Sequence, residues 1–249
     1  MNNLPSLSLV IPAYNESMRL EKTFASLSRF LGTCPFPSVE IIFVNDGSTD
    51  DTLILLNQFA RKIPARIISY PDNRGKGHAV RTGMRVATKD YAFFFDVDMS
   101  TDLPMIERFA AAMRQGAAVI IGTRKVAGAE IRKHQSWWRE MLGKGYTLLA
   151  RIVLGVPVTD FTCGFKCFHR TAREAVFRRA LIDRWSYDAE ILYLAHRLGF
   201  QIFEIPVIWV NDKSSSVRLC RDIIQSFFDL FAIRSNHSFA DVIDFHLHS

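Results

Sequence analysis

Short apolar runs that end in polar residues alternate with helical segments through the first half of this chain, and this alternation limits its fold more than any other feature. The apolar runs predict strands at residues 7–13, 39–44, 66–70, 91–95 and 117–122. The segments between them have helical spacing and predict helices at 17–31, 49–61, 77–87 and 103–114. Strands that are apolar on both faces and alternate with helices form a mostly parallel sheet covered on both sides. The predicted fold class is therefore α/β.

The second half is more basic and less regular. It predicts, in order, a helix at 136–154, a strand or bulged hairpin at 160–168, helices at 172–180 and 188–198, and a last strand at 201–210. Residues 217–233 form an amphipathic segment, with apolar side chains set against charged ones. An amphipathic helix can pack its apolar face on the core or lie in the headgroup plane of a membrane.

The composition is that of a folded protein with an anionic partner. Hydrophobic residues make up 49% of the chain and charged residues 22%, which excludes a disordered chain. The net charge of +6 suits phosphates, nucleic acid or a membrane surface. The four cysteines lack the spacing of a zinc site or a disulfide framework, and we interpret them as reduced thiols of a cytoplasmic protein. We expect no signal peptide and no membrane-spanning run.

Polar residues follow each predicted strand of the first half. Because ligands bind at the carboxyl ends of strands in open parallel sheets, these residues are the candidates for a site. They are Tyr14, Asn15 and Glu16, then Asn45 and Asp46, then Arg74 and Lys76, then Asp96 and Asp98, then Thr123 and Arg124. Turn formation and helix capping explain one or two such junctions but not the whole series.

Asp96 and Asp98 form a D-x-D triplet directly after a buried strand. Charged residues in that position need compensation, and Mg²⁺ takes one or two carboxylates together with substrate phosphates. The triplet therefore predicts a site for Mg²⁺ or Mn²⁺. The glycines around Lys76 do not form the G-x-G-x-x-G or G-x-x-x-x-G-K-[ST] patterns, which counts against a dehydrogenase and a P-loop NTPase.

The motifs IPAYNE, VNDGSTDDT, NRGKGHAVRTGM and DVD resemble, in this order, the nucleotide-sugar domain of family-2 inverting glycosyltransferases of the GT-A fold. DFTCGFKCFHR, RWSYDAEIL and IPVIWV in the second half are similar to the polyprenyl-phosphate branch of that family, on its dolichyl-phosphate glucose synthase side. The resemblance implies a Rossmann-like, mostly parallel sheet with helices on both faces and amphipathic interfacial helices. It divides one domain into a nucleotide-sugar half (1–125), an acceptor half (126–213) and a C-terminal amphipathic helix and tail (214–249).

The resemblance also assigns roles to residues of this sequence. The nucleotide-sugar would be bound by Pro12, Tyr14, Glu16, Val44, Asp46, Asp96, Val97 and Asp98. Lys76 joins this group because of its place in a Gly-rich turn, where it is a candidate to meet a phosphate or the edge of the base. The metal would be held by Asp96 and Asp98, Arg124 would face the donor diphosphate or the acceptor phosphate, and Lys213 and Arg218 are further candidates for the acceptor phosphate. The basic helix at 136–154 adds Arg139 as a candidate for the lipid phosphate. Two positions depart from the family pattern. Ser100 stands where the mannose synthases often carry a further metal-binding Gln, and Lys213 and Arg218 match their counterparts only approximately.

The acceptor can also be inferred from the resemblance. Synthases of this family that use hydroxyl acceptors usually carry Q-x-x-R-W, and here Leu181 stands at the Gln position. We therefore infer a phosphate acceptor, which is already ionised and needs no general base. Asp160, Asp188 and Glu190 stay as alternatives, either as bases or orienting groups or as structural ion pairs with Lys166 or Arg184.

The predicted activity is transfer of glucose or mannose from a nucleotide-sugar, UDP-glucose before GDP-mannose, to a polyprenyl or dolichyl phosphate. The catalytic residues would be Asp98, Arg124, Asp160 and Asp188. The predicted location is the cytoplasmic face of a membrane, held peripherally. One alternative is a soluble glycosyltransferase acting on a sugar hydroxyl. The other, a non-catalytic nucleotide-sugar or nucleic-acid binding protein, rests on the basic stretch alone, and we expect no nucleic-acid partner.

Overall fold

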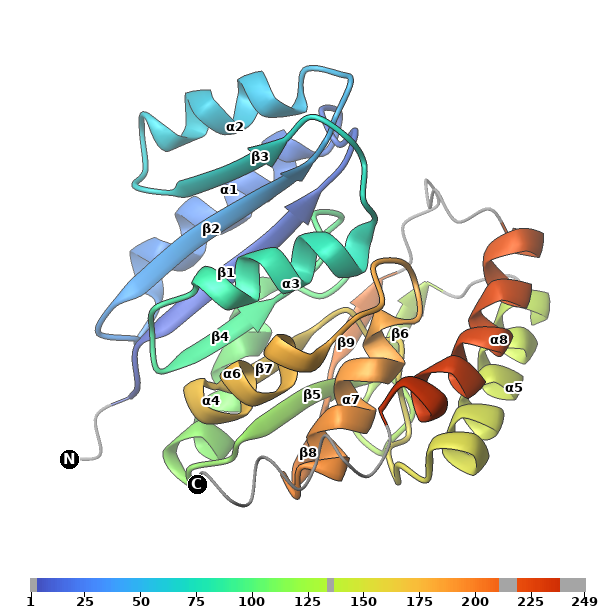
Figure 1. Ribbon diagram of the computed structural model, residues 1–249. Helices are drawn as coiled ribbons and strands as arrows, with labels where there is room; N and C mark the ends of the chain where they lie inside the picture. Colours follow the sequence, from blue (N-terminus) through green and yellow to red (C-terminus); the bar gives the residue numbers. More distant parts are fainter. Residues whose placement is uncertain (1–3, 134–136, 211–218, 238–249) are drawn as a thin grey trace.

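The computed structural model describes residues 4–133, 137–210 and 219–237 (Figure 1). Its first half follows the predicted order: β1 (Leu7–Ala13), α1 (Leu20–Thr33), β2 (Val39–Asp46), α2 (Thr52–Ala60), β3 (Arg66–Tyr70), α3 (Lys76–Val86), β4 (Tyr91–Phe94), the 3-10 turn η1 (Leu103–Met105), α4 (Ile106–Arg114) and β5 (Val119–Thr123). The second half contains β6 (Glu130–Lys133), α5 (Trp137–Leu154), β7 (Lys166–His169), α6 (Arg170–Arg179), α7 (Tyr187–Arg197), β8 (Ile202–Pro206), β9 (Ile208–Val210) and α8 (Leu219–Asn236).

A seven-stranded sheet with the order β3-β2-β1-β4-β7-β5-β8 is the centre of the fold. β1 pairs in parallel with β2 and β4, β2 with β3, and β5 with β8. β7 runs antiparallel between β4 and β5. Strands from both predicted halves therefore share one sheet, and the start of β7 lies at the same edge as the ends of β4 and β5.

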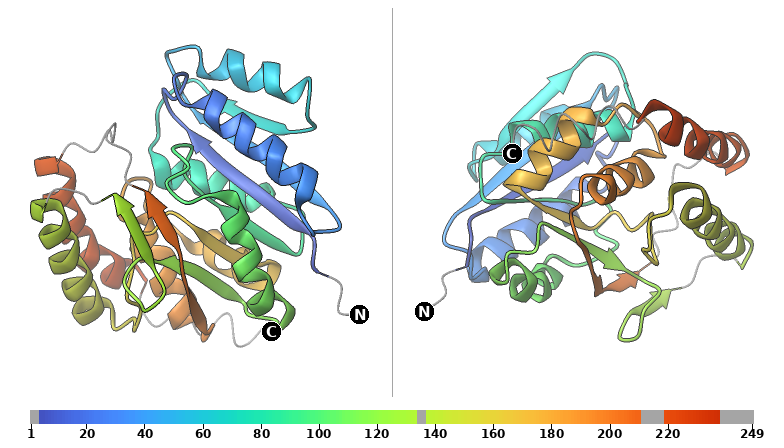
Figure 2. Two further views of the ribbon diagram at one scale, coloured as in Figure 1. Left: turned by 180° about the vertical axis from the view of Figure 1, so that it is seen from behind. Right: turned by 60° about the horizontal axis from the view of Figure 1, so that its bottom comes forward.

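Each face of the sheet is covered by helices, as the sequence predicted. Along β1, Leu7, Leu9 and Ile11 point into a core cluster with α1, α2 and α4, whereas Val10 points into a second cluster with α3, α6 and α7. This alternation is that of a strand buried on both faces. Figures 1 and 2 show the helices on the two sides of the sheet.

The second half differs from the prediction at three strands. The expected strand or hairpin over 160–168 is a loop followed by a strand of only four residues, β7. The expected strand over 201–210 is divided between two sheets, because β8 ends at Pro206, Val207 donates its N–H to Thr123 O, and β9 pairs with β6. β6 itself was not predicted, since four residues from Glu130 to Lys133 are too short and too polar to stand out.

Helices α5 and α8 lie side by side next to the sheet (Figure 2). The Tyr146 and Phe227 rings meet edge to face at 6.1 Å, and Arg234 donates to the carbonyl of Val153 at 2.7 Å. Along the part of the chain that the structure describes, none of the helices combines the length and the hydropathy that crossing a bilayer requires.

Candidate functional site

The carboxyl ends of β4 and β5 meet at an open pocket with a volume of about 110 Å³. Its walls come from the ends of β4, β5 and β9 and from the loop before β7. They are Phe95, Asp96, Asp98, Ser100, Thr101, Arg124, Thr162, Cys163, Gly164, Phe165 and Trp209. The pocket thus brings together three residues that the sequence singled out, Asp96, Asp98 and Arg124.

The D-x-D turn is held in shape by hydrogen bonds within the turn itself, from backbone N–H groups to one side chain and one carbonyl. Ser100 N donates to Oδ1 of Asp98 at 2.9 Å, and Met99, at φ +52°, donates its N–H to the carbonyl of Asp96. A non-glycine residue in this left-handed region stores strain, which is common in functional turns. Burial and the nearby charge of Asp96 raise the pKa of Asp98, so the turn concentrates negative charge where it is poorly solvated.

Asp96 has the features of a cation ligand. Its Oδ1 is buried, and no hydrogen bond of normal geometry reaches it from the described residues. A side chain at Gly164 would place its Cβ 2.5 Å from Oδ2 of Asp96, so only glycine leaves the carboxylate its space. Within 4–133, 137–210 and 219–237, no group of three or more His, Cys, Asp or Glu side chains is arranged to hold a metal ion. At the D-x-D turn, the two carboxylates of Asp96 and Asp98 both line the pocket. That set fits Mg²⁺ or Mn²⁺, which take their other ligands from phosphates and water.

Lys76 reaches the D-x-D motif from the neighbouring strand end. Its Nζ lies 2.6 Å from Oδ1 of Asp96 and 5.5 Å from the centroid of the Trp185 ring. The turn that carries Lys76 is fixed by Asp46, whose carboxylate accepts hydrogen bonds from the N–H groups of Arg74 and Gly75, both at 2.9 Å, and from the Asn73 amide at 2.8 Å. Asp46 is buried, so in this structure it orders the turn.

The other residues assigned to the nucleotide-sugar lie along the same edge. Pro12 and Val44 are buried partners on β1 and β2, and Tyr14 just beyond them is 45% exposed. Glu16 pairs with Arg19 at 2.7 Å, and burial raises the pKa of its carboxyl group. Val97 differs from this group: its side chain is in the core, and its carbonyl accepts a hydrogen bond from Thr23.

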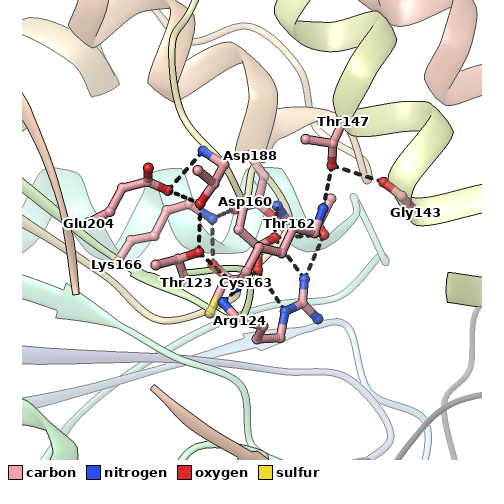
Figure 3. A network of polar contacts seen from close by, with 12 residues as sticks. Thr123, Arg124, Gly143, Thr147, Asp160, Thr162, Cys163, Lys166, Asp188 and Glu204 are labelled. Carbon is pink, nitrogen blue, oxygen red and sulfur yellow. Dashed lines mark hydrogen bonds and ion pairs between the residues drawn. The ribbon is translucent and has the colours of Figure 1, made fainter. Parts of the chain in front are cut away.

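Arg124 is the cation of the pocket, and Figure 3 shows the network that holds it. Its Nε donates to Oδ2 of Asp160 at 2.7 Å, and its Nη2 donates to Oδ1 at 2.8 Å. Nη2 also donates to Thr162 at 2.9 Å, and the guanidinium lies 5.3 Å from the Trp209 ring centroid. Burial opposes ionisation of Asp160, but the charge and hydrogen bonds of Arg124 outweigh it and hold the pKa of Asp160 well below its usual range.

The carboxylates considered as general bases are all engaged. Asp160 is completely buried against Arg124, and Asp188 forms a buried ion pair with Lys166, whose Nζ also donates to the carbonyl of Cys163 at 2.6 Å. Glu190 accepts hydrogen bonds from the N–H groups of Leu181 and Ile182, both at 2.9 Å. These partners favour an orienting or structural role over that of a free base.

Three residues assigned to the acceptor phosphate cannot be placed in the site. Lys213 and Arg218 lie outside the described residues. Arg139 belongs to α5, but its side chain lies outside them too.

The sequence interpretation missed three residues of the pocket wall. Gly164 makes room for the Asp96 carboxylate, Thr162 binds Arg124, and Trp209 flanks the same guanidinium. The sequence did contain a signal for these residues, because Thr162 and Gly164 lie within the family motif DFTCGF and Trp209 lies within IPVIWV. Their proximity to Asp96 depends on the antiparallel insertion of β7, which local pattern does not indicate.

Comparisons with known proteins agree with this geometry. The profile described as glycosyl transferase family 2 matches residues 8–177. Dolichyl-phosphate beta-glucosyltransferase of Saccharomyces cerevisiae is 34% identical over 246 residues, covering 92% of this chain and 74% of the relative. The protein of the same name from Drosophila melanogaster is 33% identical over 241 residues, covering 91% and 74%.

A solved structure shares the fold. Glucosyl-3-phosphoglycerate synthase from Mycobacterium tuberculosis, in complex with Mn²⁺, UDP and glucosyl-3-phosphoglycerate, superposes with a TM-score of 0.68 at 21% identity, covering 94% of this chain and 82% of that one. The predicted GT-A fold and glycosyltransferase activity are confirmed, and the non-catalytic alternative is set aside. The chain belongs to glycosyl transferase family 2.

Proposed function

We propose that this glycosyltransferase moves a hexose from a nucleotide-sugar to a polyprenyl phosphate, with UDP-glucose as the favoured donor and GDP-mannose as the next. The observation that carries the proposal is one pocket with the carboxylates of Asp96 and Asp98 on one wall and the guanidinium of Arg124 on another. The S. cerevisiae and D. melanogaster relatives, both dolichyl-phosphate beta-glucosyltransferases, support the acceptor and the sugar.

Asp96 and Asp98 are the residues that would hold Mg²⁺ or Mn²⁺. A bound divalent cation supplies Lewis-acid stabilisation of the departing diphosphate. The mycobacterial neighbour in complex with Mn²⁺ and UDP supports this assignment. Tyr14 and Glu16 follow the carboxyl end of β1 and would bind the nucleoside. Lys76, on the turn that Asp46 orders, would bind the phosphates.

The engaged carboxylates support a phosphate acceptor. A hydroxyl acceptor needs a base to remove its proton, whereas a phosphate monoester is largely ionised near pH 7. Asp160 and Asp188 are both buried and paired with cations, so each carboxylate is already engaged by a partner. Arg124 holds the pKa of Asp160 well below its usual range, whereas burial raises the pKa of Asp188 in spite of Lys166. Arg124, oriented by Asp160, faces the pocket, where it would bind the anionic acceptor or the diphosphate.

An exposed apolar stripe supports peripheral attachment to a membrane surface. Trp137, Met141, Leu148 and Ile152 recur at helical spacing on α5 and are 56–68% exposed. Phe228 and Phe231 of α8 are also more than half exposed. Exposed apolar side chains gathered on neighbouring helices mark an interaction site, and a lipid surface is the occupant that a polyprenyl acceptor requires.

Vesicle flotation tests the membrane proposal. We expect the 249-residue chain to float with vesicles that contain anionic lipid, and Leu148→Glu/Ile152→Glu to reduce the bound fraction at least fivefold. Ile54→Glu is the matched control, because Ile54 is 57% exposed on α2, away from α5 and α8 (Figure 1). Equal flotation of the double variant and the wild-type protein would rule out this stripe as the lipid contact.

The reaction itself is tested with UDP-glucose and GDP-mannose in parallel, with a short polyprenyl phosphate in detergent and with Mn²⁺, Mg²⁺ or a chelator. We expect labelled sugar in the lipid phase only with metal, and more from UDP-glucose. Metal-dependent release of free nucleotide without a lipid product would reject the phosphate acceptor and favour a hydroxyl acceptor.

A further inference from the structure

Lys76 is held beside Asp96 by a turn that has little freedom. Added Cβ atoms at Gly75 and Gly77 would lie 2.5 Å from the carbonyl oxygens of Asp183 and Ile182, so the turn is packed backbone to backbone against that segment. His78 N also donates to the carbonyl of Asp183 at 3.0 Å. The Cα of Lys76 is thereby fixed at the rim of the site, and only its side chain can change position.

The side chain of Lys76 lies between an aromatic ring and a carboxylate. The Trp185 ring flanks the ammonium at 5.5 Å, and Oδ1 of Asp96 lies 2.6 Å from Nζ. Apart from this ion pair, the buried Oδ1 of Asp96 has no hydrogen-bond partner among the described residues. The ammonium therefore lies beside the oxygen best suited to bind a metal.

An ammonium and a divalent cation cannot share this oxygen without strong repulsion. Asp96 Oδ1 has little access to water, so the repulsion between the two cations is poorly screened. A metal that binds Asp96 must displace Lys76. The displaced ammonium loses its anionic partner unless a nucleotide diphosphate enters the site and provides another.

We propose that Lys76 is the resident counter-ion of Asp96 and competes with the divalent metal, so that the nucleotide diphosphate and the metal bind cooperatively. This inference rests on the proposed metal-dependent donor site. Lys76 opposes the metal when it is alone and binds the diphosphate when both are present. By thermodynamic linkage, UDP then tightens metal binding by the same factor as the metal tightens UDP binding.

Manganese binding to the 249-residue chain tests the proposal without any turnover. Free Mn²⁺ is measured by electron paramagnetic resonance during titration, with and without UDP, for the wild-type protein, Lys76→Met and Arg74→Met. Arg74→Met is the matched control, since it removes one positive charge from the same turn while Arg74 lies over the Tyr70 ring at 5.5 Å and not at Asp96. Lys76→Gln repeats the test with a polar side chain, and circular dichroism establishes that each variant is folded.

In the absence of UDP we expect Lys76→Met and Lys76→Gln to bind Mn²⁺ about fivefold to tenfold more tightly than the wild-type protein, and Arg74→Met less than twofold more tightly. The enhancement of Mn²⁺ binding by UDP should shrink by a similar factor in the Lys76 variants. Unchanged or weaker Mn²⁺ binding by folded Lys76 variants would overturn the competition while leaving the donor site intact. Absence of any UDP effect on wild-type Mn²⁺ binding would overturn the proposed donor site and this inference with it.

Discussion

Arg124 and Asp160 form a two-point ion pair in which the arginine lines the pocket and the aspartate is completely buried behind it. The planar fork of a guanidinium matches a carboxylate in this geometry, so Asp160 fixes the direction of the Arg124 side chain. Pairing with Arg124 also explains how the carboxylate of Asp160 stays ionised although it is completely buried. The effect of breaking this ion pair can be measured separately on kcat/KM and on the free energy of unfolding.

Asp160→Asn should lower kcat/KM about 10- to 100-fold, because Arg124 loses the carboxylate that orients it toward the anionic reactants. The same change should lower the free energy of unfolding by about 2 kcal/mol or more, since a buried ion pair is broken from one side. Steady-state kinetics with both donors and urea unfolding provide the two values. Wild-type kcat/KM in the variant would show that Asp160 does not position Arg124 for the reaction.

The stability difference between wild-type protein and Asp160→Asn should depend on pH. Burial would raise the pKa of Asp160, but Arg124 holds the folded-state pKa well below the unfolded value of about 4. A depressed carboxyl pKa adds stability above the unfolded pKa, and this stability is lost as pH falls toward the folded pKa. Urea unfolding should therefore give a constant difference from about pH 7 to 5 and a shrinking one below about pH 4. A difference that grows on acidification would contradict this assignment.

Asp98→Ala should reduce sugar transfer at least about 100-fold without unfolding the protein. Asp96 and Asp98 repel each other in a partly buried turn, where burial and the Asp96 charge raise the pKa of Asp98. Removing one carboxylate relieves that repulsion but also removes the acceptor of the Ser100 N–H, so the two effects offset each other and the unliganded variant should melt within a few degrees of the wild-type protein. Activity assays and thermal melting test both statements, and full activity in Asp98→Ala would remove the metal assignment.

Gly164→Ala should impair the site through sterics alone. The new Cβ would lie 2.5 Å from Oδ2 of Asp96, so the carboxylate would have to shift from its position in the D-x-D turn. We expect at least a tenfold loss of kcat/KM and weaker Mn²⁺ binding in the presence of UDP. Gly32→Ala in α1 is the matched control, since its Cβ would meet nothing within 4 Å. Equal effects of the two substitutions would exclude the close contact with Asp96 as the cause.

Local pattern predicted the first half of the fold because each strand there is a continuous apolar run and each connection carries helical spacing. It could not predict β7, since four residues from Lys166 to His169 owe their place to pairing with β4 and β5, far away in sequence. The division of the last strand at Pro206 has a similar origin, because the partners of β9 are the short, polar residues of β6.

The candidate site was predicted in the same uneven way. Asp96 and Asp98 directly follow the apolar run of a predicted strand, and the structure places them in the pocket with Arg124. The partner of Arg124 could not be predicted, because Asp160 lies 36 residues further along and reaches it only through the tertiary fold. Ion pairs chosen by three-dimensional proximity leave no periodic trace in a sequence.

Lys166→Met should destabilise the fold by about 3 to 5 kcal/mol, because it leaves the buried Asp188 carboxylate without its cation. Lys166→Met/Asp188→Leu removes both charges and should recover a large part of that loss, since two apolar side chains can replace a buried ion pair at little cost. Urea unfolding of both variants measures the difference. If the double variant is no more stable than Lys166→Met, the loss comes from packing around Phe94, over whose ring the Lys166 ammonium lies, and not from an unpaired charge. Transfer activity in a folded double variant would show in addition that Asp188 is not required as a base.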